Sequence, residues 1–427
     1  MKVSLRAMDH VSSSAYQRPA FARSEPVERT TSPRVAALVA DPRSAPEFWE
    51  AAERDGTPLV EPDPLGDPRR RAVTFLWRDH LVDGWPARFV LLHANKFTDY
   101  DELASCALDR VPGTDVWCAT FRLPSDWRCG YRFGPLPAPP HLGGRSRRDE
   151  LMRHSEPDPL ARNAMVGRQS GTVTSVAELD DAPEQHWVDA DPDPRRCHEL
   201  AVPGSHPVWL HRSARKAAGV LVLLDGHTWA AEHPIRPVLD AAEASAVLPP
   251  LDVLLVGTSP AGRLADLGCN PALPDHLADV VLPSAAMRYG RDRTIVAGQS
   301  FGGLAAVHTG LSRPDVFGAV LAQSGSFWFR AGEWLRDLPG AEPVRVALQV
   351  GTQEWGMGPV TRDTRSALAD RGHEVTLREY CAGHDKVSWR GGLVDGLAEL
   401  ASAWWAPRQS EKPNVRPLNR IPVEELP

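Results

Sequence analysis

Residues 294–303 read TIVAGQSFGG and decide the fold of the second half of the chain. Residues 298–302 form a GxSxG motif, which an apolar strand pattern precedes and a helical pattern over 301–311 follows. This is the context of a nucleophile elbow, in which a serine sits in a strained turn between strand and helix and flanking glycines avoid a collision with neighbouring backbone. The motif predicts Ser300 as a nucleophile. A glycine-rich turn without chemistry remains the alternative.

From Gly219 onwards, apolar runs alternate with helical patterns, which predicts a parallel sheet built from βαβ units. The predicted fold class is α/β, with a doubly wound, mainly parallel sheet of the α/β-hydrolase type. Such sheets bind ligands at the carboxyl ends of their strands. The predicted strands cover residues 220–224, 253–256, 294–297, 317–322, 344–350 and 375–380, and the predicted helices cover 237–245, 277–289, 301–311, 362–371 and 392–405.

The first half has a different pattern, in which short strand-like runs are separated by Gly, Pro and Asp turns. That pattern predicts a small antiparallel sandwich. A Ser/Arg/Pro-rich opening without periodicity predicts disorder at the N-terminus. The expected organisation is a disordered segment over 1–46, a sandwich domain over 47–210, a catalytic domain over 211–406 and a flexible tail over 407–427.

Composition excludes several classes of function. The 427 residues are 42% hydrophobic and 24% charged, with a formal net charge of -7, so they show no basic footprint for nucleic acid. Residues 1–16 contain no apolar leader segment, and the longest apolar run, 219–224, is too short to span a bilayer. We expect a cytoplasmic protein with no membrane partner. The six cysteines form no CxxC pair, so neither a zinc site nor a disulfide framework is predicted. No sequence signal indicates an oligomeric state.

A serine hydroxyl needs an imidazole to take its proton, and in this fold the order along the chain is serine, acid, histidine. His384 lies in a glycine-containing loop, CAGHD, after the last predicted strand and before the closing helix. His308 belongs to the helix that follows the serine, and His373 precedes a strand at the wrong end of the sheet. His384 is therefore the predicted base, with a surface or capping histidine as the alternative.

The acid that orients the imidazole should follow the predicted strand 344–350. Glu354 is the best placed carboxylate. Asp363 lies farther along, on the next predicted helix, and Asp385 adjoins the base and should point elsewhere. A surface glutamate or a Ser–His dyad remains open.

Two backbone N–H groups are predicted to form an oxyanion hole. One belongs to Phe301, directly after the nucleophile, and the other to His227 in the loop LLDGHTW after the first core strand. Gly226 allows that loop to turn toward the serine. Trp229 is either an aromatic wall of the pocket or a core residue.

These residues resemble a known family, the enterochelin esterases, which hydrolyse the ester backbone of ferric catecholate siderophores. The resemblance covers about Phe48 to Trp405, and the family pairs an immunoglobulin-like sandwich with the hydrolase domain. The similar segments are FLWRD (75–79), PGTDVW (112–117), WR (127–128) with Tyr131 and Phe133, LLDG (223–226) with Trp229, Arg263 with Leu267, Cys269 and Asn270, RT (293–294), GQSFGG (298–303), QSGSFW (323–328), Glu354, GHD (383–385) and WRGG (389–392).

The resemblance implies that Ser300 and His384 are catalytic, that Glu354 is the acid and that Arg263 contacts substrate. Trp229, Trp389 and Arg390 are further binding candidates, because an anionic, aromatic iron complex needs positive charge and flat apolar surface. The expected partner is a small ferric siderophore such as enterobactin. Neither a cofactor nor a resident metal is expected, since iron would arrive only as part of the substrate.

Some positions depart from the family pattern, and these leave the substrate more open than the chemistry. Asp266 stands in place of a glutamate, Leu273-Pro274 in place of an aromatic pair, and Val280 in place of a second glutamate. A general carboxylesterase or thioesterase acting on an acyl group unrelated to iron is therefore the alternative function. A siderophore-binding protein without catalysis is a third, which the intact serine and histidine disfavour.

Overall fold

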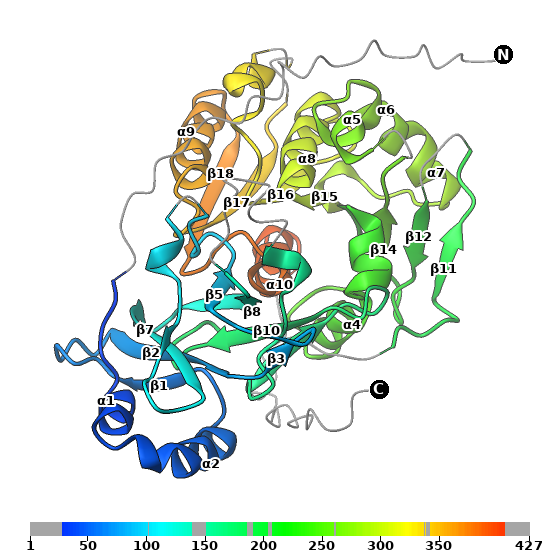
Figure 1. Ribbon diagram of the computed structural model, residues 1–427. Coiled ribbons are helices and arrows are strands. Elements are labelled where there is room, and N and C mark those ends of the chain that lie inside the picture. The colour runs from blue at the N-terminus through cyan, green and yellow to red at the C-terminus, as the bar shows by residue number, and fades with distance from the viewer. Residues whose placement is uncertain are drawn as a thin grey trace.

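A computed structural model describes residues 28–100, 102–138, 151–185, 191–203, 207–259, 262–336, 338 and 342–405. Within these ranges an all-β unit formed by the first half packs against a larger α/β unit formed by the second (Figure 1). No helix in the described ranges is long and apolar enough to cross a membrane.

Two four-stranded antiparallel sheets form the sandwich, in the orders β1-β2-β7-β6 and β5-β8-β10-β9. Aromatic side chains fill the space between them: Phe75 of β2 lies edge-on to Tyr131 of β8, with ring centroids 4.9 Å apart. This architecture confirms the predicted all-β fold of the first half. The strands are β1 (Leu59–Pro62), β2 (Arg70–Arg78), β5 (Phe89–Ala94), β6 (Asp109–Arg110), β7 (Val116–Pro124), β8 (Arg128–Leu136), β9 (Asn163–Val166) and β10 (Val173–Glu178), with a separate ribbon of β3 (Leu81–Val82) and β4 (Trp85–Pro86) and a 3₁₀ turn η3 (Leu103–Ser105).

The prediction of disorder over 1–46 is wrong for residues 28–46, which form ordered structure. Helix α1 (Pro33–Ala40), the 3₁₀ turn η2 (Pro42–Ser44) and α2 (Ala45–Asp55) lie there. Ser32 caps α1 by accepting a hydrogen bond from the backbone N–H of Val35 at 3.1 Å, and Leu38 and Trp49 are buried against the first sheet. The Ser/Arg/Pro-rich composition therefore concealed helices that packing stabilises. Residues 1–27 and the predicted tail 407–427 lie outside the described ranges.

The α/β unit contains one eight-stranded sheet in the order β11-β12-β14-β13-β15-β16-β17-β18. The strands from β14 to β18 are parallel, whereas β11 and β12 form an antiparallel edge. The predicted domain boundary at 210/211 is therefore too late, because β11 and β12 precede it and belong to the α/β unit. In sequence, this short antiparallel pair has the same pattern as two strands of the sandwich. The strands are β11 (Cys197–Leu200), β12 (Val208–His211), β13 (Gly219–Leu224), β14 (Leu251–Val256), β15 (Thr294–Gln299), β16 (Ala319–Gln323), β17 (Arg345–Gly351) and β18 (Glu374–Tyr380).

Helices cover both faces of this sheet, which explains why β13 is apolar at every position. Val222 packs on the side of α8, and Leu221 on the side of α4 and α10. The doubly wound α/β fold class is thus confirmed. The helical segments are η4 (Thr228–Glu232), α4 (Arg236–Ala244), α5 (Arg263–Leu267), α6 (Ala272–His276), η5 (Leu277–Val281), α7 (Leu282–Ser284), η6 (Arg291–Arg293), α8 (Phe301–Ser312), η7 (Phe329–Leu335), α9 (Met357–Asp370) and α10 (Lys386–Ala401).

Helix α10 lies in the middle of the molecule, in contact with β16 and β17 on one side and with β8 of the sandwich on the other (Figure 1). It begins six residues earlier than predicted, at Lys386 instead of Gly392. The loop that carries His384 therefore leads directly into a helix that both units hold.

Candidate active site

Ser300 occupies a strained turn between β15 and α8, with φ 58° and ψ -117°. A Cβ on Gly298 would lie 2.3 Å from the carbonyl oxygen of Gly302, so no other residue fits there. The turn is fixed further by hydrogen bonds at both ends, from Ser300 N–H to the Gln323 carbonyl and from Ser326 N–H to the Ser300 carbonyl, each 2.9 Å. A left-handed serine costs on the order of 1–3 kcal/mol, and such strain persists where the surroundings fix it for function.

His384 and Glu354 form a hydrogen-bonded pair at the carboxyl end of the sheet, between His384 Nδ1 and Glu354 Oε2. Glu354 is 1% exposed, and its Oε1 accepts from Ser324 Oγ at 2.6 Å and from Gly351 N–H at 2.9 Å. Burial alone would raise the pKa of Glu354, but the charge and hydrogen bond of His384 and the other two donors lower it below its ordinary value. Glu354 is thus held as a carboxylate that fixes the orientation of the imidazole.

The rival residues lie elsewhere. Asp363 is exposed on α9. His373 accepts a hydrogen bond from Val344 N–H at 3.2 Å at the amino end of β17, far from the strand ends that carry Ser300. His308 is part of α8. The structure therefore brings Glu354, and not Asp363, to His384.

A cavity of about 260 Å³ opens beside Ser300 at the carboxyl ends of the central strands. Its walls come from the loop after β13, from α5, from the elbow and from the first turn of α10. The lining residues are Asp225, His227, Thr228, Trp229, Arg263, Gln299, Ser300, Lys386 and Trp389.

The loop after β13 approaches the serine closely. Asp225 adopts a left-handed conformation with φ 58°, and a Cβ on Gly226 would lie 2.4 Å from the carbonyl carbon of Leu255, so only glycine fits at that position. The loop places His227 in the cavity wall, and Phe301 opens helix α8 directly after the nucleophile. The two backbone groups expected at an oxyanion hole thus come from the two segments that border Ser300.

Trp229 combines both roles that the sequence left open. It is 1% exposed within the core between the sheet, α4 and α10, and it also forms part of the cavity wall. Its indole N–H donates to Gln299 Oε1 at 2.8 Å and begins a chain of buried amides at the strand ends. Gln299 donates to Gln323 at 2.8 Å, Gln323 to Gln349 at 2.7 Å, and Gln349 to the carbonyl of Gly392 on α10 at 2.8 Å.

Arg263 also lines the cavity, but its charge is already paired. Its Nε and one terminal nitrogen bind the two carboxylate oxygens of Asp225 at 2.5 and 2.7 Å, and that nitrogen also donates to the Gln299 carbonyl at 3.0 Å. The guanidinium further lies over the Phe301 ring, 5.9 Å from its centroid. Arg263 therefore ties the loop after β13 to the elbow strand, a role that the sequence did not reveal.

Of the two candidates on α10, one lines the cavity and the other does not. Trp389 is in the cavity wall, its ring lies edge-on to the His384 imidazole at 4.8 Å, and its N–H donates to Ser324 Oγ at 2.9 Å. It thus links the serine cavity to the His384–Glu354 pair. Arg390 is 7% exposed and donates to Gln185 Oε1 at 2.8 Å, so it faces the sandwich side instead of the cavity. The expectation that Arg390 helps to form the pocket is wrong, because consecutive helical residues point about 100° apart.

Sequence reasoning missed Lys386, Thr228 and Gln299 as cavity residues and Ser324 as a donor to the acid. Gln299 and Ser324 lie within the segments GQSFGG (298–303) and QSGSFW (323–328), so these segments could have indicated that they belong to the site. Lys386 follows GHD directly, but its place in the cavity depends on where α10 begins.

The sandwich holds the His384 loop from the other side. Asn95 Nδ2 donates to the His384 carbonyl at 2.5 Å, and Gly130 N–H of β8 donates to Asp385 Oδ2 at 3.0 Å. Asp385 also caps α10 by accepting from Ser388 N–H at 3.0 Å. As expected, Asp385 points away from the serine.

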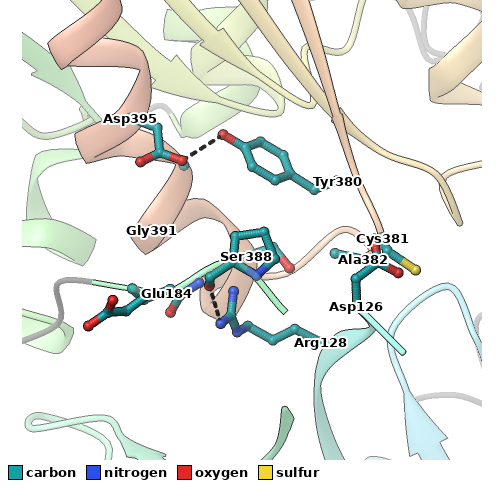
Figure 2. Close-up of a pocket in the computed structure, with 12 residues that line it drawn as sticks. Asp126, Arg128, Glu184, Tyr380, Cys381, Ala382, Ser388, Gly391 and Asp395 are labelled. Carbon is teal, nitrogen blue, oxygen red and sulfur yellow. Dashed lines mark hydrogen bonds between the residues drawn. The ribbon is translucent and has the colours of Figure 1, made fainter. Parts of the chain in front are cut away.

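Figure 2 shows the contact region behind this loop, a small cavity of about 20 Å³ between β8, the end of β18 and α10. On the sandwich side, Arg128 bonds to the Pro183 carbonyl and, at 2.7 Å, to Glu178. On the opposite side, Tyr380 donates to Asp395 of α10 at 3.3 Å. This cavity shares no lining residue with the serine cavity.

Ser300 Oγ lies 3.4 Å from Ser326 Oγ, and Trp389 connects the serine cavity to the His384–Glu354 pair. A hydroxyl on a strained turn, a histidine oriented by a carboxylate, and backbone N–H groups on two neighbouring segments suit acyl transfer. Among the residues that the structure describes, no group of three or more His, Cys, Asp or Glu side chains is arranged to hold a metal ion.

Known proteins share both units of this chain. A family model described as enterochelin esterase, N-terminal, matches residues 72–188, and one described as putative esterase matches residues 203–400. The iron(III) enterobactin esterase of Dickeya dadantii (strain 3937) is 33% identical over 86% of this chain and 95% of its own length, and that of Escherichia coli (strain K12) is 31% identical over 78% and 91%. The crystal structure of an enterobactin esterase from Shigella flexneri in the presence of enterobactin covers 84% of this chain and 98% of its own, with 27% identity and a TM-score of 0.71.

Proposed function

Because this chain belongs to the enterobactin (enterochelin) esterase family, we propose that it hydrolyses the ester backbone of a ferric catecholate siderophore such as enterobactin. The observation that carries the proposal is the arrangement around Trp389, which lines the cavity of Ser300 and packs its ring against the His384 imidazole that Glu354 orients. A serine on a strained elbow and a histidine oriented by a carboxylate, each adjoining Trp389 or its cavity, provide the parts of a Ser–His–acid esterase.

In the proposed mechanism, His384 takes the proton of Ser300 as Oγ attacks an ester carbonyl carbon. The backbone N–H groups of His227 and Phe301 stabilise the negative charge on the carbonyl oxygen. The tetrahedral intermediate collapses, His384 protonates the departing alcohol, and an acyl group remains on Ser300. A water molecule, deprotonated by His384, then releases the acid and restores the serine.

Glu354 contributes by fixing His384, since it bonds Nδ1 and so leaves Nε2 for the proton transfer. Its hydrogen bonds from Ser324 and Gly351 hold the carboxylate in place while the imidazole gains and loses charge. Trp229 and Trp389 supply flat aromatic surface to the cavity, which suits catecholate rings.

Hydrolysis of the trilactone would weaken iron binding, because three catecholates on separate fragments lose the effective concentration that a common backbone gives them. Iron enters this scheme as part of the substrate, and the proposed chemistry uses no resident cofactor or metal. A cytoplasmic location follows from the proposal, since release of iron is useful where iron is consumed. Neither nucleic acid nor membrane takes part in the proposed reaction.

The test is incubation with ferric and iron-free trilactones, with mass spectrometry of the products. We expect linear fragments that gain one water for each ester cleaved, and none with Ser300→Ala. Turnover of simple acyl esters or thioesters with both trilactones left intact would replace this proposal with a general esterase. Tight binding of the ferric complex without cleavage would indicate a binding protein.

A further inference from the structure

Lys386 is a half-buried cation in the wall of the serine cavity. It is the first residue of α10, immediately after the Asp385 cap and two residues after His384. Lys386 thus shares one cavity with Ser300 and Trp389. No step of the proposed mechanism uses it.

Two local effects, the helix dipole and burial, disfavour a charged Lys386 at this position. The first turn of a helix carries partial positive charge, so a cation there is repelled. Burial lowers the pKa of its ammonium, although the negative charges of Glu232 and Asp225 act in the opposite direction. A side chain that local preferences oppose is a candidate for function.

The acidic neighbours of Lys386 are bound to other groups. Asp225 forms its two-point pair with Arg263. Glu232 accepts from the backbone N–H groups of Gln169 and Ser170, at 3.2 and 3.1 Å, in the β9–β10 turn. Within the described ranges, no carboxylate lies within ion-pair distance of the Lys386 ammonium. Of the charged side chains that line the cavity, Asp225 and Arg263 compensate each other, so Lys386 supplies its net positive charge.

We propose that Lys386 is a substrate-binding residue that receives a catecholate oxygen of the ferric siderophore and so favours the iron-loaded over the iron-free substrate. The inference rests on the proposed function and adds a source of selectivity to it. A tris-catecholate complex of Fe(III) carries three net negative charges, whereas an iron-free catechol keeps its protons at neutral pH. An ammonium in a partly desolvated cavity therefore distinguishes the two forms by charge, and the neighbouring Trp389 gives the catecholate ring a flat surface.

The experiment compares Lys386→Met, which keeps the length of the side chain and removes its charge, with Lys386→Arg, which keeps the charge. Lys216→Met is the matched control, because Lys216 is exposed and precedes β13 at the opposite end of the sheet. Values of kcat and KM are measured for the ferric trilactone, the iron-free trilactone and a small neutral ester. Hydrogen bonds to charged groups contribute enough for a loss of about tenfold to a hundredfold.

We expect Lys386→Met to lower the ratio of kcat/KM for ferric over iron-free trilactone by about tenfold or more, mainly through KM. Lys386→Arg should restore most of that ratio, and Lys216→Met should leave it at the wild-type value. A ratio within about twofold of wild type in Lys386→Met would overturn the inference while leaving the proposed function intact. If the wild-type protein cleaved neither trilactone, both would be overturned. Removing a cation from a helix N-terminus should not harm folding.

Discussion

Arg263 donates hydrogen bonds to both carboxylate oxygens of Asp225, at 2.5 and 2.7 Å, and thereby joins the loop after β13 to the start of α5. Asp225 is 6% exposed and left-handed, so without its partner it would remain as a nearly buried charge in a strained loop. We predict that Arg263→Ala lowers kcat/KM about tenfold or more for the siderophore and for a small neutral ester alike, because the loop that carries the His227 N–H loses its anchor.

The check is steady-state kinetics on both substrates, with Arg336→Ala as a control at an exposed arginine. Loss on the siderophore alone would assign Arg263 to substrate binding, as the family resemblance implies, and contradict the anchoring role.

Ser300→Ala should fold normally and lose nearly all ester hydrolysis, a loss on the order of a million-fold in favourable cases. The alanine relieves none of the backbone strain, so thermal stability should stay close to that of the wild type. Circular dichroism and single-turnover assays check the two halves of this expectation. Residual activity within about tenfold of wild type would exclude Ser300 as the nucleophile.

Glu354→Gln should lower kcat by up to ~10⁴-fold, because an amide neither fixes the imidazole tautomer nor stabilises the imidazolium. Substrate affinity should change little, since Glu354 lies behind His384 and is absent from the cavity wall. The rates are compared over a series of pH values, so that a change in protonation is separated from loss of the acid. Asp363→Asn, at an exposed position on α9, is the matched control and should be silent. The opposite pattern would remove Glu354 from the proposed triad.

Asp385→Ala tests whether the sandwich positions the His384 loop. The change removes the α10 cap and the acceptor for Gly130 N–H, so we expect a stability loss of about 1–2 kcal/mol together with a several-fold fall in kcat. Asp385→Asn keeps an acceptor oxygen and should retain most of both. Denaturant titration and kinetics separate the effects. An equal stability loss with kcat unchanged would reduce Asp385 to a helix cap.

His233 predicts how stability depends on pH. Burial lowers the pKa of His233 from 6.5 to about 4, with the charges of Lys386 and Arg390 adding to the effect and that of Glu232 opposing it. The unfolded chain thus binds a proton at this histidine below about pH 6.5, while the folded protein binds it only below about pH 4. Lowering the pH through this window favours unfolding, by on the order of 2 kcal/mol.

The measurement is the free energy of unfolding at pH 7 and pH 4.5 for the wild type and for His233→Gln. The glutamine does not titrate, so the variant should lose less stability than the wild type between these values. An identical pH dependence in both proteins would show that His233 does not contribute.

The sequence anticipated the parts of this protein that short-range rules control. Continuous apolar strands specified a sheet covered on both faces, and the GxSxG turn placed Ser300 between a strand and a helix. The order of serine, acid and histidine pointed to Glu354, since the chain must return to the same sheet edge after each parallel strand.

The sequence did not predict helix α1 or the correct sheet for strand β12. Helix α1 looked disordered because its stability comes from burial of Leu38 against a distant sheet. Strand β12 resembled a sandwich strand because an antiparallel edge strand has the same local pattern wherever it pairs.

Long-range contacts decided what remains, because charge pairing and burial depend on residues far apart in the chain. The family resemblance predicted that Arg263 binds substrate. Only the fold shows that Asp225 pairs with its charge. Arg390 directly follows Trp389 in the sequence. On helix α10, however, the two side chains point in different directions, Arg390 toward Gln185 and Trp389 toward the cavity. Nothing in the sequence distinguished Lys386. The early start of α10 placed it in the cavity of Ser300, and the nearby carboxylates bind other groups, so it has no ion-pair partner among the described residues.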